Sequence, residues 1–383
     1  LADKYKMNID PYSKIWQLSV GEQQRVEILT AIYQGADILI LDEPTAVLTP
    51  QEANILFDML RHMKADGKSI ILITHKLEEI ISIVDEVTVL RDGELIGSKL
   101  VDEHTTKEEL TKMMVGRDVL FNFDKNQKAP GAVKVELKGL SASNDKGLPA
   151  LTDFNLTVHE GEILGLAGVD GNGQKELCEV LTGLRKADGG QFLFKGKEVI
   201  NQPPVFYINS GISHIPEDRM TTGLALNWSL KKNLIIKKFH KAPFSKNGLL
   251  NQKAIDAYWD KCQKEYQIKA NSGEDHARAL SGGNQQKVIL ARELDDHPEM
   301  VIANQPTRGL DIGASEYVRQ KILDARNDGA AVLLVSADLE EILQLSDRIA
   351  VIYDGKIMGI LPAGTDTNTI GMLMMGHKQE EKA

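Results

Sequence analysis

Two stretches of this chain combine residue types and positions that suit phosphate chemistry. A glycine-rich stretch at residues 168–176 follows an apolar run at 163–167, and the carboxylate pair Asp42 and Glu43 follows an apolar run at 38–41. Glycines between a strand and a helix let backbone N–H groups turn toward phosphate oxygens at the positive end of the helix. The first stretch therefore predicts a phosphate-binding loop. The acidic pair predicts a functional site, with an ordinary exposed pair as the alternative.

The glycine-rich loop lacks two side chains that usually bind a nucleotide. In the usual motif a lysine contacts the β- and γ-phosphates, and a serine or threonine hydroxyl binds Mg²⁺. Gln174 stands at the lysine position and Lys175 at the hydroxyl position. The other loop residues that we expect to bind nucleotide are Gly168, Gly171, Asn172 and Gly173. The loop can cradle a polyphosphate, but it has lost the metal ligand and the charge that stabilises phosphoryl transfer.

The carboxylate pair belongs to a segment that occurs twice, at a constant offset of 262 residues and without gaps. The matching segments are residues 18–24 and 280–286, 39–45 and 301–307, 73–75 and 335–337, and 91–93 and 353–355. A repeat unit of this length indicates a duplicated domain rather than a short solenoid repeat. The second copy has neutral residues at three positions where the first has ionisable ones. Asn304, Gln305 and Ala337 replace Asp42, Glu43 and His75.

Apolar runs of four to six residues alternate with longer amphipathic stretches, a pattern typical of βαβ units around buried strands. We expect strands at 38–41, 69–73 and 163–167, a hairpin with an Asp-Gly turn over 87–96, antiparallel strands at 133–137 and 156–158, and helices within 220–278. The polar segment 124–132 predicts a linker. We therefore expect residues 1–123 to be the C-terminal half of a first domain, 133–376 to be a complete second domain, and 377–383 to be a disordered tail.

The composition is that of a globular protein large enough for two or three domains. Of its 383 residues 42% are hydrophobic, and 55 acidic residues outnumber 45 basic ones for a net charge of −10. An acidic chain without a block of Lys and Arg argues against nucleic acid as a partner. Cys178 and Cys262 have no zinc-site or disulfide spacing, so we expect buried thiols. No apolar run approaches the ~20 residues that cross a bilayer.

The order and spacing of these segments resemble the nucleotide-binding domains of ABC transporters. Residues 18–24 and 280–286 are similar to the family's signature segment, 38–45 to its Walker B strand, and His75 to its switch histidine. The resemblance implies an α/β fold of the P-loop NTPase class, with two ABC-type nucleotide-binding domains in tandem. Each domain would have a mixed or parallel sheet core, an antiparallel β part and a helical subdomain. The implied ligands are ATP and Mg²⁺.

The resemblance also implies a role for each charged residue of the first copy. Asp42 would hold Mg²⁺ through its water shell, Glu43 would orient or deprotonate the attacking water, and His75 would sense the γ-phosphate. Family domains pair head to tail, so each nucleotide lies between the phosphate loop of one domain and the signature of the other. The signature residues expected to bind nucleotide are Ser281, Gly282, Gly283, Asn284 and Gln285 in the second copy and Ser19, Val20, Gly21 and Glu22 in the first.

On this interpretation the intact elements gather at one implied site and the altered elements at the other. The catalytic residues of the first copy would face residues 281–285, with Asp311 at the position of an aspartate that reaches across the family's domain interface. In the first copy that position is Thr49. We interpret one site as hydrolysing and the other as structural or regulatory. Random drift of the altered positions is the alternative, but it fits poorly because they would all line one site.

Two nucleotide-binding domains in one chain resemble the ATP-binding subunits of bacterial importers of simple sugars and nucleosides, and the Pro-Glu-Asp-Arg segment at 216–219 supports this. The implied partners are transmembrane permease subunits and, indirectly, an extracytoplasmic substrate-binding protein. The implied location is the cytoplasmic face of the bacterial cell membrane. Two alternatives stay open: a soluble tandem ABC ATPase that acts on ribosomes or nucleic acid, and a module that only binds nucleotide.

The start of the chain differs from the family pattern. It begins with Leu1, 17 residues before the first signature segment, and no glycine-rich loop precedes that segment. We therefore expect an N-terminally truncated chain whose missing ~125 residues hold the first phosphate loop. This piece alone is then expected to be inactive as an ATPase.

Overall fold

The computed structural model describes most of residues 1–377. The residues that it leaves undescribed are 3, 6–8, 11, 16–17, 19, 46–47, 49, 75, 92, 117–129 and 378–383. The chain divides into two compact units, Leu1–Val119 and nearly all of the remaining residues. Most of the predicted linker and of the predicted tail lies outside the described residues, so both stay predictions. Among the described helices, none combines the length and the apolar character needed to cross a membrane.

The first unit alternates helices and strands as the sequence predicts. Its elements are α1 (Val20–Tyr33), β1 (Ile38–Asp42), α2 (Pro50–Ala65), β2 (Ser69–Ile73), α3 (Leu77–Ile83), β3 (Glu86–Arg91), β4 (Glu94–Leu100) and α4 (Lys107–Val115). Strands β1 and β2 pair in parallel, and β3 and β4 form the expected antiparallel hairpin. Helix α2 buries one face, formed by Leu56, Met59, Leu60 and Met63, with Leu39 of β1 in the same core. This spacing of three and four residues places all four side chains on one side of the helix.

The second unit begins with an antiparallel part and continues into a larger mixed sheet. Its strands are β5 (Val133–Ser143), β6 (Pro149–His159), β7 (Ile163–Ala167), β8 (Gly189–Phe194), β9 (Lys197–Glu198), β10 (Ile212–Ile215), β11 (Ser245–Lys246), β12 (Leu249–Leu250), β13 (Met300–Asn304), β14 (Ala331–Ser336), β15 (Arg348–Tyr353) and β16 (Lys356–Pro362). The large sheet has the order β10-β13-β14-β7-β15-β16, and β16 alone runs antiparallel to its neighbour. The antiparallel sheet has the order β6-β5-β8-β9. The predicted mixed sheet and antiparallel part are thus confirmed.

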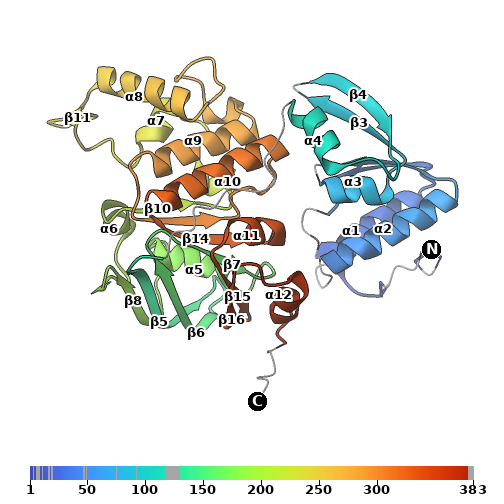
Figure 1. Ribbon diagram of the computed structural model, residues 1–383, viewed down its shortest axis with the longest axis horizontal. Coiled ribbons are helices and arrows are strands. Elements are labelled where there is room, and N and C mark those ends of the chain that lie inside the picture. Colours follow the sequence, from blue (N-terminus) through green and yellow to red (C-terminus); the bar gives the residue numbers. More distant parts are fainter. Residues whose placement is uncertain are drawn as a thin grey trace. The chain divides into compact units, whose positions relative to one another are not determined.

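Helices cover the large sheet because its central strands are apolar on both sides. The helices of this unit are α5 (Gln174–Leu181), α6 (Pro204–Asn209), α7 (Leu230–Ile235), α8 (Gln252–Glu265), α9 (Gly282–Leu294), α10 (Ile312–Asn327), α11 (Leu339–Leu345) and α12 (Thr367–Met374). Within β13, Val301 and Ala303 pack in one core with α9 and α10. Met300 and Ile302 pack in a second core with α5 and the antiparallel sheet. Figure 1 shows the sheet between these two layers.

The parallel pairing brings three strand ends to one edge of the sheet. Asn304 at the end of β13 pairs with Val335 of β14, and Ser336 at the end of β14 pairs with Ala167 of β7. The loop that follows β7 is the glycine-rich stretch, which leads into α5. Side chains that follow these three strands therefore meet at the same edge, where ligands of parallel α/β sheets generally bind.

A small hairpin within the region expected to be helical was not predicted. Strands β11 and β12 form a small antiparallel hairpin around Asn247 and Gly248, which have φ angles of 54° and 79°. The Asn-Gly pair is the strongest short hairpin signal. It was present in the sequence, within a region for which only helices were expected. Helices α7 and α8 confirm the rest of that expectation.

A buried ion network fixes helix α9 to strand β10. The Glu293 carboxylate accepts hydrogen bonds from the His214 backbone N–H at 3.1 Å and from Arg292 Nε at 2.8 Å, and it forms an ion pair with Lys237. Burial would raise the pKa of Glu293, but the charges of Lys237 and Arg292 outweigh burial and lower that pKa to about 2. Burial lowers the pKa of His214 to about 4. The network holds the helix that carries the second signature segment.

The low pKa of His214 predicts a pH dependence of stability. Because the folded-state pKa lies below the unfolded value, the unfolded chain binds the proton first, and stability is lost as pH falls from about 6.5 toward 4. We expect His214→Gln to remove about 3 kcal/mol of this pH-dependent loss. The measurement is urea unfolding of the second unit between pH 8 and 4. The control is His297→Gln, which changes an exposed imidazole, and an unchanged slope in His214→Gln would contradict the assignment.

Candidate functional site

The carboxylate pair of the first copy lies at the end of β1, at the edge where parallel strands finish. Asp42 is the last residue of the strand and is exposed. Glu43 follows with a φ of 45°, and its N–H donates to the Ile73 carbonyl at the end of β2 at 2.8 Å. A positive φ is unfavourable for a residue with a Cβ. This hydrogen bond helps to hold the turn that presents the Glu43 carboxylate.

The second copy keeps this backbone and changes only the side chain. Gln305 has a φ of 48°, and its N–H donates to the Val335 carbonyl at the end of β14 at 2.7 Å. Gln305 and Asn304 are both buried. The two copies therefore present an acid and an amide from the same backbone geometry.

The Gln305 amide joins three segments at the edge of the large sheet. Its Nε2 donates to Asp170 Oδ1 in the glycine-rich loop at 3.2 Å. Its Oε1 accepts the N–H of Ala337, the first residue after β14, at 3.1 Å. A carboxylate only accepts hydrogen bonds. The bond to Asp170 thus depends on the amide that replaces the acid.

The glycine-rich loop bonds to itself through two further amides. Gln174 is buried, accepts the Asn172 N–H at 3.0 Å and donates to the Val169 carbonyl at 2.9 Å. Asn172 donates to the same carbonyl at 2.8 Å and accepts the Asp354 N–H at 2.7 Å. The position where a lysine usually reaches phosphates therefore holds a side chain that braces the loop.

Glycine at position 173 is required by close packing. It has a φ of 104°, and an added Cβ would lie 2.4 Å from the Ala150 carbonyl oxygen. The residue begins α5 as its N-cap. The loop thus keeps the backbone turn of a phosphate site, although its side chains have changed.

Lys175, at the usual hydroxyl position, is directed away from the loop. Its Nζ pairs with Asp145 at 3.0 Å in the turn between β5 and β6, and this contact raises the pKa of Lys175. No group of three or more His, Cys, Asp and Glu side chains that could hold a metal ion occurs in the described part of the chain. That finding is compatible with a metal ion that is surrounded largely by water molecules and held by the Asp42 carboxylate through this water shell. The second copy offers an amide, Asn304, at the same position.

The second signature segment lies at the start of α9. Ser281 is the N-cap, and Gly282 and Gly283 begin the helix, where N–H groups lack helical partners. Asn284 donates to Ser281 Oγ at 3.1 Å and accepts the Lys269 N–H at 2.8 Å. Gln285 is buried and donates to the Ala277 carbonyl at 3.2 Å, which is a structural contact.

The first signature segment begins helix α1 at the matching repeat position. Val20, Gly21 and Glu22 are the first three residues of α1. Three predicted positions, Ser19, Thr49 and His75, lie outside the described residues. Asp311 immediately precedes α10.

The Pro-Glu-Asp-Arg segment after β10 contacts the loop after β13. Arg308 forms ion pairs with Glu217 and, at 3.9 Å, with Asp170. Arg219 donates to the Arg308 carbonyl at 2.6 Å. Through Arg308 this segment is therefore linked to Asp170 of the glycine-rich loop, which Gln305 also contacts.

Sequence reasoning missed a buried glutamate that both copies share. Glu79 in α3 accepts hydrogen bonds from Thr45 and, at 2.8 Å, from Thr74. Glu341 in α11 lies at the same repeat position and is fully buried. Burial raises the pKa of Glu341, while the Arg319 charge and hydroxyls of Ser336 and Thr307 oppose that rise. The identical Leu-Glu-Glu triplets at 77–79 and 339–341 were the available signal.

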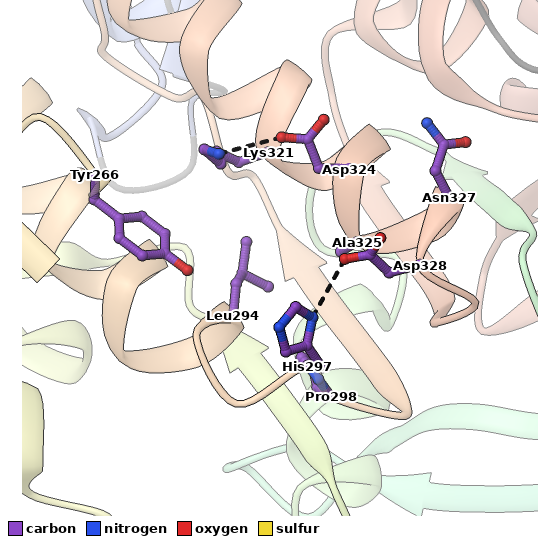
Figure 2. Close-up of a pocket in the computed structure, with 9 residues that line it drawn as sticks. All are labelled: Tyr266, Leu294, His297, Pro298, Lys321, Asp324, Ala325, Asn327 and Asp328. Carbon is purple, nitrogen blue, oxygen red and sulfur yellow. Dashed lines mark hydrogen bonds and ion pairs between the residues drawn. The ribbon is translucent and has the colours of Figure 1, made fainter. Parts of the chain in front are cut away.

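A cavity of about 380 Å³ lies elsewhere in the second unit (Figure 2). Pro298, just before β13, and Asp328, just after α10, contribute to its lining. The cavity is thus near the amino ends of β13 and β14, whereas the candidate site follows their carboxyl ends. Its charged groups pair locally, Lys321 with Asp324 at 3.2 Å and His297 with Asp328 at 3.3 Å.

Comparison with known proteins identifies the family. A family model described as ABC transporter matches residues 2–46 and 151–308. The glucose import ATP-binding protein TsgD13 of Haloferax volcanii is 46% identical over 98% of this chain and 69% of its own length. The chain belongs to the ABC transporter family. As an ABC transporter ATP-binding protein, it binds ATP and is an ATPase coupled to transport.

Other ABC relatives cover nearly the same part of the chain. The guanosine import ATP-binding protein NupO of Bacillus subtilis is 46% identical over 100% of this chain and 75% of its own length. The ribose import ATP-binding protein RbsA of Halalkalibacterium halodurans is 38% identical over 90% of this chain and 67% of its own length. A crystal structure of a nucleotide-free ATP-binding cassette from an ABC transporter is 21% identical and covers 62% of this chain and 95% of that chain, with a TM-score of 0.54. That structure confirms the ABC-type α/β fold.

The bridge through Gln305 generates a test of the altered ABC site. Gln305→Glu places two carboxylates together and removes a donor, so we expect a loss of about 1–3 kcal/mol in the unfolding free energy of the second unit. Amide hydrogen exchange in residues 168–174 should become faster. The double variant Gln305→Glu/Asp170→Asn should recover most of both losses, because an amide again faces a carboxylate. Equal stability of the single variant and the unaltered protein would contradict the bridge.

Proposed function

We propose that this protein powers the import of nucleosides or simple sugars through an ABC transporter, by hydrolysing ATP at one competent site beside one altered site. Relatives named for the import of glucose, guanosine and ribose support the transport role. They do not favour a protein that acts on ribosomes or nucleic acid, or one that only binds nucleotide. They leave open which of these compound classes is carried.

The observation that carries the proposal is the shared backbone of residues 43 and 305. Both have a left-handed φ and the same hydrogen bond to the neighbouring strand. One holds a carboxylate that can accept a proton from water, and the other holds an amide that cannot. The difference in chemistry therefore lies in the side chain rather than in the fold.

Each residue of the first copy has a proposed task at the competent site. Glu43 orients or deprotonates the attacking water, and His75 contacts the γ-phosphate. Asp42 would hold the water shell of Mg²⁺, and this ion, when bound, would supply positive charge for the phosphate oxygens. The exposed position of Asp42 at a strand end supports that task.

The signature residues complete this proposal. Ser281, Gly282 and Gly283 lie at the start of α9, where free N–H groups and the helix dipole suit a phosphate. We assign them, with Asp311, to the competent site. Asn284 and Gln285 support this helix start through their own hydrogen bonds. Residues 19–22 serve the altered site in the same way.

The altered site is proposed to be structural or regulatory. The glycine-rich loop keeps Gly168, Gly171 and Gly173. The Gln174 amide occupies the Asn172 N–H and, together with the Asn172 amide, the Val169 carbonyl, while Lys175 pairs outside the loop. Binding of a nucleotide there would have to compete with these internal bonds.

The proposed partners are transmembrane permease subunits and, through them, an extracytoplasmic substrate-binding protein. The import relatives support such partners. The proposed location is the cytoplasmic face of a bacterial cell membrane, because an import ATPase must contact its permease and reach ATP.

The asymmetry predicts unequal effects of two matched substitutions. In the transporter assembled with its permease, Glu43→Gln should lower ATP turnover by about 100-fold or more, since general acid–base contributions reach 10²–10⁴-fold. Gln305→Ala should change turnover less than about threefold, because no proton transfer depends on it. The measurement is phosphate release under saturating ATP. Comparable losses from both substitutions would refute the assignment of one competent site.

The transported compound can be identified separately. Cells that lack this subunit should lose uptake of one class of labelled compound, either nucleosides or simple sugars, and regain it when the subunit is restored. Glu43→Gln should not restore uptake, because import requires ATP turnover. Unaltered uptake of both classes in the deleted cells would oppose the proposed transport role.

A further inference from the structure

A long part of the second unit contains no acidic residue. Residues 219–255 hold eight Lys and Arg side chains and no Asp or Glu, in a chain whose net charge is −10. This part includes α7 and the unexpected hairpin β11–β12. We call residues 239–253 the basic hairpin. Figure 1 shows the β11 strand at the outer end of this unit, beyond α7 and α8.

Three of the four lysines just before the hairpin are neutralised by acids from other elements, and the fourth, Lys232, is exposed. Lys231 pairs with Asp256 at 2.6 Å, and Lys238 pairs with Asp296 at 2.9 Å. Lys237 pairs with the buried Glu293. These three cations therefore contribute to packing, and little of their charge remains for a ligand.

The lysines within the basic hairpin keep their charge. Lys241, Lys246 and Lys253 are exposed, and none of them forms an ion pair with any described residue. Lys241 donates only to the neutral side-chain oxygen of Asn209, at 2.7 Å. Three positive charges thus face solvent within 13 residues of sequence.

Large apolar side chains are exposed among these cations. Leu249 is 77% exposed, Leu250 is 56% exposed and Phe239 is 50% exposed. Exposed apolar groups that gather at one place often mark an interaction surface. Cations beside exposed Leu and Phe side chains are also the composition of segments that lie in a membrane interface.

The base of the hairpin is packed, so its exposed tip is held in place. Phe244 is buried with Ile235 and Ile255, and its ring contacts the Tyr258 ring edge-on at 5.1 Å between centroids. The Asn251 N–H donates to the Phe244 carbonyl at 2.8 Å. The leucines are therefore presented on a supported turn rather than on a loose loop.

We propose that the basic hairpin binds the anionic headgroups of the membrane in which the permease lies. This inference rests on the proposed function for the presence of that membrane. Anionic lipids attract Lys side chains at short range, and Leu side chains enter the boundary between headgroups and acyl chains. Because the rest of the chain is acidic and repelled by such lipids, contact through the hairpin also fixes the orientation of the unit.

Charge favours lipid over the cytoplasmic loops of a permease as the partner. Such loops carry an excess of Lys and Arg. A hairpin with three unpaired lysines would be repelled by a loop of that composition and attracted by anionic headgroups. Apolar contact alone would suit either partner, so the charge decides between them.

The test is flotation of the purified protein, without permease, with vesicles of phosphatidylglycerol or of phosphatidylcholine. We expect binding to the anionic vesicles only, and weaker binding as salt rises, because salt screens exposed charges. Lys246→Glu/Lys253→Glu should raise the apparent dissociation constant at least tenfold. Leu249→Asn/Leu250→Asn should also weaken binding, and it should reduce the fraction that stays bound at high salt.

A matched control changes the same net charge elsewhere. Lys186 and Lys197 are exposed and lie outside the hairpin, so Lys186→Glu/Lys197→Glu should change vesicle binding less than twofold. All variants should keep the circular dichroism spectrum and melting temperature of the unaltered protein. Failure of that protein to bind phosphatidylglycerol vesicles, or equal loss in the control, would overturn the proposal.

Two other outcomes separate this proposal from the proposed function. If Lys246→Glu/Lys253→Glu leaves vesicle binding intact but prevents assembly with the permease in detergent, the hairpin docks on protein and the lipid proposal is wrong. If vesicle binding is normal while the assembled transporter shows no ATP turnover that depends on Glu43, the proposed function fails and the lipid surface stands.

Discussion

Parallel pairing of strands is the constraint on which the candidate site depends. In each unit the strand that carries residue 42 or 304 ends beside a parallel neighbour, and the N–H of the next residue donates to one carbonyl at or next to the end of that neighbour. In the second unit the same pairing continues to β7 and its glycine-rich loop. Residues far apart in the sequence therefore reach one edge of the sheet. A shift of one residue in this register would turn every side chain to the other face.

The two copies show how a fold can persist while its chemistry changes. The left-handed turn, the hydrogen bond to the neighbouring strand and the buried glutamate of α3 or α11 occur in both. Gln305 adds what a carboxylate cannot, since an amide donates to Asp170 and accepts from Ala337 at once. The amide that stands in place of the carboxylate thus supplies a link between the loop and two strand ends.

Much of the fold was predictable because its signals are local or repeated. Apolar runs located the strands, the Asp-Gly turn located β3 and β4, and the constant offset matched α1 with α9. The interactions of Glu293 were not predictable, because its partners His214 and Lys237 lie on separate segments of the chain and ordinary sequence patterns do not specify such pairs. The hydrogen bonds of the Asn172 and Gln174 side-chain amides within the glycine-rich loop were missed for a similar reason. They depend on side-chain rotamers that the sequence does not determine.

The sign of the net charge says little about where charge acts. A chain with net charge −10 argued against nucleic acid as a partner, yet residues 219–255 of one unit hold eight Lys and Arg side chains and no Asp or Glu. The lysines of this part fall into two groups that differ in burial and in ion pairing. Near the core Lys237 and Lys238 meet acids near the end of α9, so their charges strengthen packing. In the basic hairpin Lys241, Lys246 and Lys253 form no ion pair with a described residue, and β12 holds Leu249 and Leu250 in solvent. Such exposure contributes nothing to folding, which is why the tip is better explained by contact with a surface than by stability of the unit.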